Sequence, residues 1–114
     1  MNLHEVINKL GLTVCCGSPD MDCKVTGAYV SDLLSNVIAT AKQGDVWITV
    51  QSHVNVVAVS VLKELAAVII VQGREPAEST IQKAKEENVI ILLSQQSAYQ
   101  VAGKLYQIGV GALP

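Results

Sequence analysis

The chain has 114 residues, of which 50% are hydrophobic and only 16% are charged, and its formal net charge is -2. This length suits a single domain spanning residues 1–114, with one substantial core. Four aromatic residues and the slight negative charge give neither the basic surface nor the stacking platform of a nucleic-acid-binding protein. The hydrophobic excess over the charged fraction predicts an oligomer, most simply a two-fold homodimer.

The chain shows no sign of membrane insertion or secretion. No apolar run reaches the roughly 18 to 20 residues of a membrane helix, and the amino terminus, with His4 and Glu5, lacks a signal-peptide pattern. Three cysteines, Cys15, Cys16 and Cys23, are an odd number that suits no disulfide framework. We therefore expect a cytoplasmic protein with reduced, partly buried thiols.

The amino-terminal third predicts a helix, two short strands and a second helix. Asn2 caps the first helix and Gly11 ends it. Residues 12–15 form a strand candidate that ends in the turn cluster 17–20. Residues 23–29 form another, in which Gly27 predicts a bend or bulge. Ser31 or Asp32 is expected to cap the next helix. The apolar faces of the two helices are Leu3, Val6, Ile7 and Leu10 in the first, and Leu33, Leu34, Val37, Ile38 and Ala41 in the second.

A pattern of apolar strand, polar loop and helix then occurs three times. The strands are predicted at residues 46–50, 67–71 and 89–93, and each runs into a polar cluster. Continuously apolar strands are buried on both faces, which predicts an α/β fold with a largely parallel sheet covered by helices.

The last two helices have readable ends. Pro76 suits the first turn of a helix over residues 76–87, with acidic residues near its start and Lys83 and Lys85 near its end. Lys83 is also spaced for ion pairs with Glu86 and Glu87 on a solvated face. Ser97 and Gln100 have capping-box spacing, so the final helix begins near Ala98. Its predicted buried residues are Ala98, Val101, Ala102, Leu105 and Ile108.

Two segments, VTGAYVSDLLS at residues 25–35 and DVWITVQSHVNVVAV at residues 45–59, give the chain a family resemblance. Together with the order of elements, they resemble the DRTGG-domain family, which is related to the amino-terminal domain of HPr kinase/phosphorylase. The resemblance covers residues 6–108 and implies a three-layer α/β/α domain that dimerises and is attached to metabolic enzymes or to regulatory CBS modules. It also implies an accessory role beside iron-hydrogenase or serine-kinase systems.

Two motifs of the related proteins do not occur. The Asp-Arg-Thr-Gly-Gly run that names the family is not found; by element order its place is residues 51–55. The P-loop pattern of the kinase domain is also missing, so phosphoryl transfer by this chain alone is excluded.

Polar residues after the three repeated strands form the candidate ligand site. In a parallel sheet these loops meet at the carboxyl edge, beside helix amino termini that favour anions. Gly73 would allow close backbone approach, and Arg74 would pair with a phosphate or carboxylate. The alternative is that these residues only cap helices and form turns. The candidate residues are Gln51, Ser52, His53, Asn55, Gly73, Arg74, Ser94 and Gln95.

Neither His53 nor the cysteines predict catalysis or metal binding. His53 is expected to begin a helix, where the dipole favours its neutral form, and only Ser52 is near it in sequence. The three thiols fall short of the four ligands of zinc or iron–sulfur sites, unless a second chain completes a cluster.

Two classes of function remain: a non-catalytic regulatory or assembly module that binds a small anionic metabolite or nucleotide, and an enzyme or accessory subunit that uses His53 and Arg74. The lack of an evident base–nucleophile pair favours the first class. The sequence does not identify a cofactor, the ligand or any protein partner.

Overall fold

The computed structural model describes residues 1–17 and 23–111, which form five helices and five strands. In chain order these are α1 (Leu3–Leu10), β1 (Thr13–Cys16), β2 (Gly27–Val30), α2 (Leu34–Thr40), β3 (Asp45–Thr49), α3 (Asn55–Lys63), β4 (Ala67–Ile70), α4 (Glu78–Glu87), β5 (Ile91–Leu93) and α5 (Ala98–Gln107). The strands form one sheet in the order β1-β5-β4-β3-β2. Strands β2 to β5 are parallel, and β1 pairs antiparallel with β5.

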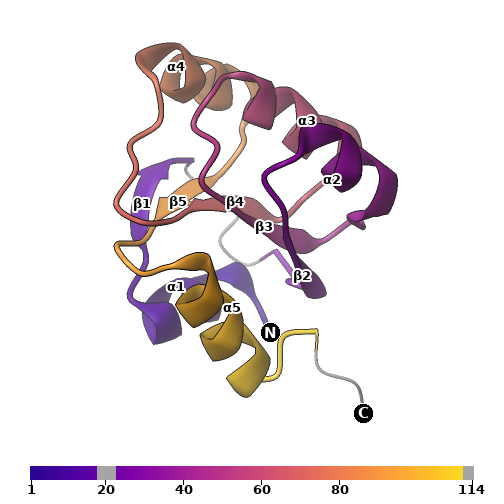
Figure 1. The fold of residues 1–114 in the computed structure, drawn as a ribbon, viewed down its shortest axis with the longest axis vertical. Helices are drawn as coiled ribbons and strands as arrows, with labels where there is room; N and C mark the ends of the chain where they lie inside the picture. Colours follow the sequence, from indigo (N-terminus) through magenta and orange to yellow (C-terminus); the bar gives the residue numbers. More distant parts are fainter. Residues whose placement is uncertain (18–22, 112–114) are drawn as a thin grey trace.

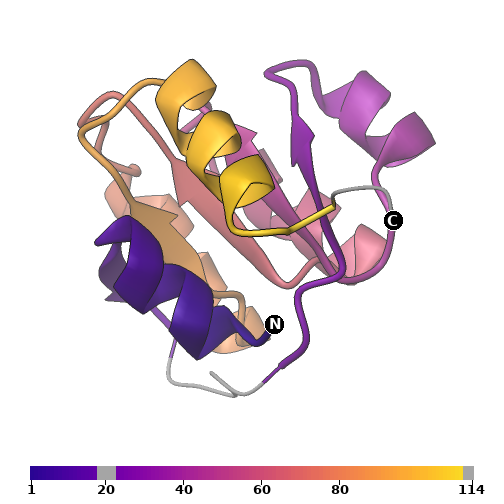
Figure 2. The ribbon, with the colours of Figure 1, turned by 90° about the horizontal axis from the view of Figure 1, so that it is seen from below.

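Helices cover both faces of this sheet. Figure 1 shows α2, α3 and α4 on one side of the strands and α1 with α5 on the other. Figure 2, turned by 90°, shows α1 and α5 lying side by side across the sheet. The predicted three-layer α/β/α fold with a largely parallel sheet is therefore confirmed.

The central strands supply both hydrophobic cores, because their side chains alternate between the two faces. Ile48 and Ile69 pack under α1 and α5, whereas Trp47, Val68 and Ile70 pack under α2, α3 and α4. All five are fully buried. This two-sided burial explains the unbroken apolar runs in the sequence and confirms the parallel-sheet interpretation.

The predicted ends of the first and last helices are confirmed. Asn2 and Glu5 form a capping box at α1, and Gly11 ends that helix in the left-handed conformation with φ 65°. Ser97 and Gln100 form the equivalent box at α5. Local hydrogen bonding between side chain and backbone determines these ends, so sequence spacing alone identifies them.

The predicted start of the second helix was wrong. Neither Ser31 nor Asp32 caps α2, whose amino-terminal cap residue is Leu33 and has no side-chain hydrogen bond. Leu33 is 64% exposed and Ile38 is 41% exposed, so neither belongs to the buried face, although Val37 is fully buried. Instead, the extended segment before α2 lies alongside the end of β3. Ser31 and Asp32 are hydrogen-bonded there to residues of β3.

Other boundaries differ by a few residues. Helix α4 begins at Glu78, and Pro76 is a buried residue of the preceding loop. Strand β2 begins at Gly27 and pairs regularly with β3. The irregularity expected at Gly27 occurs in β1 instead, between Val14 and Cys16. Most of the predicted turn cluster, residues 18–20, lies outside the described residues.

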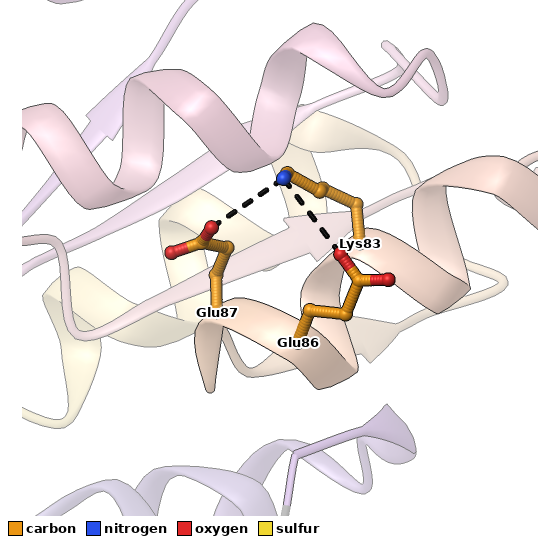
Figure 3. Close-up of polar contacts among 3 residues, drawn as sticks. All are labelled: Lys83, Glu86 and Glu87. Carbon is orange, nitrogen blue, oxygen red and sulfur yellow. Dashed lines mark ion pairs between the residues drawn. The ribbon is translucent and has the colours of Figure 1, made fainter.

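The exposed face of α4 carries the ion pairs expected from residue spacing. Lys83 Nζ lies 3.7 Å from Glu86 Oε2 and 3.5 Å from Glu87 Oε1 (Figure 3). All three side chains are about half exposed, so such pairs stabilise the fold by only a few tenths of a kcal/mol, roughly 0.2 to 0.5 each. In the ranges 1–17 and 23–111, no helix has the length and apolar character needed to cross a membrane.

Candidate functional site

The loops after β3, β4 and β5 meet at the carboxyl edge of the sheet, because these strands are adjacent and parallel. Backbone hydrogen bonds join the loops. The amide of Gln72 donates to Gln96 O at 2.9 Å, and that of Gly73 donates to Ser94 O at 2.9 Å. The carbonyl of Ser52 accepts from the Thr80 hydroxyl at 2.8 Å. All eight predicted ligand residues therefore belong to one continuous edge.

The base of this edge is organised by Asp32, a residue whose role sequence reasoning missed. Its Oδ1 atom accepts hydrogen bonds from Thr49 Oγ1 at 2.8 Å and from the amide of Val50 at 2.9 Å. Gln51 Nε2 donates to the Asp32 carbonyl at 2.9 Å. The only local signal was Thr49, a polar residue in an apolar strand. Gln51, predicted as a ligand residue, is thus held within the fold.

The loop after β5 is also occupied by internal contacts. Ser94 Oγ accepts from the amide of Gln96 at 3.1 Å, and Gln96 Oε1 accepts from Lys104 Nζ at 2.9 Å. Gly73 has φ 66°, and a Cβ atom there would lie 2.6 Å from Gln95 Oε1. The Gln95 side chain therefore occupies the space beside Gly73 where close approach of a ligand was expected.

His53 is exposed and lies two residues before α3, which corrects the prediction that it begins the helix. Its Nδ1 atom accepts a hydrogen bond from the amide of Asn55 at 3.2 Å. His53 thus satisfies one of the amide groups at the start of α3, and its Nδ1 carries no proton in this arrangement. The other ring nitrogen, Nε2, is then a donor in the neutral imidazole.

Arg74 and Asn55 are exposed as well, and so are Gln72, Glu75 and Gln95 of the same loops. The Arg74 amide donates to Val71 O at 3.3 Å, which fixes the turn after β4. Among the described residues, the ion pairs are confined to α4 and leave the Arg74 guanidinium without a carboxylate partner. The edge therefore presents the His53 donor and the Arg74 charge to solvent, together with the exposed carboxylates of Asp32 and Glu75.

A cavity of about 710 Å³ lies at the opposite edge of the sheet. Its lining includes Gly44 before β3, and Glu64 and Asn88, the residues that end α3 and α4. Helix carboxyl ends and Glu64 disfavour an anion there. A cavity of about 420 Å³ at the carboxyl edge is lined by Glu75, Ser94, Gln95, Gln96 and Lys104, among others. This second cavity holds the Lys104 ammonium, but it also has the Glu75 carboxylate and the carboxyl end of α1 at Gly11, so the two cavities alone do not distinguish the edge that an anion would prefer.

The described residues contain no group of three or more His, Cys, Asp or Glu side chains that would hold a metal ion. Cys15, Cys16 and Cys23 carry thiols rather than disulfides. Burial, together with the neighbouring Cys15 thiol, raises the pKa of Cys16 to about 11. The Cys16 thiol is therefore protonated at neutral pH and is a poor nucleophile.

Comparison with known proteins gives one family and one fold. A family model for the DRTGG domain matches residues 5–108. The chain is similar to the crystal structure of the CBS and DRTGG domains of the regulatory region of Clostridium perfringens pyrophosphatase, complexed with its activator, diadenosine tetraphosphate. The TM-score is 0.75 at 14% identity, over 93% of this chain and 46% of that chain. This chain therefore spans less than half of that structure. No curated protein sequence matches.

Proposed function

Because the chain belongs to the DRTGG-domain family, we propose that it is a non-catalytic regulatory module that binds a small anionic metabolite of the nucleotide class. The proposed site is the carboxyl edge of its sheet. The observation that carries this proposal is that His53 and Arg74 are exposed on neighbouring loops. The Ser52 carbonyl, beside His53, is hydrogen-bonded to the start of α4, the helix that follows the Arg74 loop. Arginine recognises phosphate groups through bidentate hydrogen bonds.

A structural relative supports the class of ligand. The Clostridium perfringens pyrophosphatase region that shares this fold is complexed with diadenosine tetraphosphate, an activator. At 14% identity the similarity shows the fold alone, so the place of the site in this chain is argued from its own residues. The charge of Arg74 and the N–H donor of His53 are the groups that a phosphate would use.

The contacts of His53 favour binding over catalysis. A general base needs a free lone pair within reach of the proton that it removes. In His53 the Nδ1 lone pair accepts a hydrogen bond from the Asn55 amide, and Nε2 is a donor. This arrangement suits a ring that donates a hydrogen bond to an anion.

We further propose that the module is a homodimer. Leu33 is 64% exposed and Val30 on β2 is 49% exposed, and β2 is the strand at the end of the sheet, beside β3. Exposed apolar side chains beside an open strand edge are typical of an interaction surface. Sedimentation at micromolar concentration is expected to show a dimer, and a Leu33→Asp variant is expected to dissociate it. A monomeric wild-type protein would remove this part of the proposal.

The binding proposal is tested by thermal unfolding with a panel of nucleotides, dinucleoside polyphosphates and inorganic phosphate. A ligand at 100 times its Kd stabilises the native state by about 2.7 kcal/mol. Arg74→Ala should abolish the ligand-dependent rise in Tm. Lys42→Ala, which removes an exposed positive charge before β3 at the opposite edge, is the matched control and should preserve it. An equal loss in both variants, or no rise with any compound, would argue against the proposed site.

A further inference from the structure

Two adjacent cysteines of β1 lie on the same side of the sheet. Successive side chains of a regular strand point to opposite faces. In the pairing of β1 with β5, however, Val14 lies opposite Leu92 and Cys16 lies opposite Ile91, so Cys15 is the extra residue of a β-bulge. Cys16 belongs to the core under α2, α3 and α4, and Cys15 packs against that same core. The bulge therefore presents two thiols together.

The two thiols belong to adjacent residues that pack on the same core, and they can be reached from the edge of the sheet. Cys16 is 5% exposed, whereas Cys15 is half-buried. Strand β1 is the edge strand beyond β5. A small reagent that reaches the Cys15 sulfur thus finds the Cys16 sulfur beside it.

The surroundings suit a soft centre rather than a hard cation. Burial raises the pKa of the Cys16 thiol, and Lys85 of α4 acts more weakly in the opposite direction, towards the thiolate. Thiolates select soft metals, whereas calcium and magnesium require oxygen ligands. Structural zinc takes four protein ligands, and the described residues supply no group of even three. Two thiolates alone suit an ion or metalloid that is satisfied by two sulfur bonds.

We propose that Cys15 and Cys16 form a dithiol site for a thiophilic centre that accepts two thiolates, a chemistry shared by monovalent copper and trivalent arsenicals. With an arsenical oxide, two S–H bonds break and two As–S bonds form, and the oxide oxygen leaves with both protons as water. With monovalent copper, both protons go to solvent and two Cu–S bonds form. Neither reaction transfers electrons, so neither requires an oxidant or a reductant.

The first test uses the full chain and phenylarsine oxide, followed by intact mass spectrometry and thiol titration. The expected product is a one-to-one adduct that leaves one titratable thiol, survives an excess of monothiol and is reversed by a dithiol. Cys15→Ser should lose this adduct, and Cys23→Ser, the matched control, should keep it. Survival of the adduct in Cys15→Ser or its loss in Cys23→Ser would overturn the proposal.

A second arm distinguishes the two sources of this chemistry. Copper(I) is offered to the protein in competition with bicinchoninate, and retention is compared between wild type, Cys15→Ser and Cys16→Ala. Circular dichroism melts confirm that each variant is folded. Copper retained only by the wild type identifies a metal site, and arsenical binding without copper retention identifies a metalloid site. If neither probe binds the folded wild type, the proposal is wrong.

Discussion

The carboxyl edge of the sheet has two layers of polar residues that differ in what they contact. In the lower layer, Asp32, Thr49 and Gln51 hydrogen-bond to one another and to the backbone. In the upper layer, His53 and Arg74 are exposed to solvent. Gln51 of the lower layer and His53 of the upper layer both follow β3, so position at the edge does not by itself identify a ligand residue. The difference lies in which side chains remain available for a ligand.

This comparison divides the edge into a part that holds the fold and a part that is available for binding. Substitutions in the lower layer and in the strands beneath it should change the free energy of unfolding. Substitutions in the upper layer should change ligand binding and leave the free energy of unfolding nearly constant.

The largest effect is expected for Ile48→Ala, in the strand beneath both layers. Ile48 is fully buried between β3 and the helices α1 and α5. Its truncation removes apolar contacts and leaves a cavity, at a cost of about 2 to 5 kcal/mol in unfolding free energy. Urea denaturation measures this value. Val61→Ala, on the exposed surface of α3, is the control and should stay within about 0.5 kcal/mol of the wild type.

A smaller effect is expected for Asp32→Ala in the lower layer. This substitution leaves the Thr49 hydroxyl and the Val50 amide without their acceptor. Loss of hydrogen bonds to a charged group predicts a cost of about 1.5 to 3 kcal/mol. Asp32→Asn retains an acceptor oxygen and should recover part of that stability. If Asp32→Ala unfolds at the same urea concentration as the wild type, the lower layer does not stabilise the fold.

The buried Cys16 thiol of β1 predicts that the stability of the fold depends on pH. The pKa of Cys16 is raised by burial from 9.0 to about 11, so the folded state holds a proton that the unfolded state releases. Stability is fully present below pH 9 and falls as pH rises towards 11, by on the order of 2 kcal/mol. Urea denaturation at several pH values measures this loss. Cys16→Ala should lack this component of the pH dependence, and an unchanged slope would contradict the assignment.

The smallest effects on stability are expected for His53→Ala and Arg74→Ala in the upper layer. Both side chains are exposed, and the Asn55 amide, which donates a hydrogen bond to His53, can bond to water instead. We therefore expect each variant to unfold within about 0.5 kcal/mol of the wild type. Thermal denaturation without ligand checks this expectation. A loss of several kcal/mol in either variant would place that residue in the stabilising layer.

The fold was predictable because its main determinants are local or periodic. Apolar runs in β3, β4 and β5 indicated strands buried on two faces, and the Asn2 and Ser97 capping boxes indicated two helix starts. The lower layer was not predictable in this way. Asp32 contacts Thr49, 17 residues later in the chain, and its sequence position equally suited a helix cap. Only the paired strands show which role it takes.

The candidate site was predictable as an edge but not as a set of free side chains. Parallel strands place the three loops together, as expected. The sequence could not show that Gln95 occupies the space beside Gly73, or that Gln51 bonds to Asp32. Such contacts depend on side chains from separate loops. The β1 bulge was not predictable for the same reason, because the pairing of β1 with β5 determines the face of the sheet on which each cysteine lies.

The most direct test of the carboxyl-edge site is a titration of the isotopically labelled chain with diadenosine tetraphosphate, followed by amide chemical shifts in NMR spectra. The account predicts that the shift changes concentrate in residues 51–55, 72–75 and 94–96, at the ends of the three parallel strands. Changes concentrated in residues 43–44, 64–66 and 88–90, at the opposite edge, would contradict it. An unchanged spectrum with this and every other nucleotide of the panel would contradict it equally.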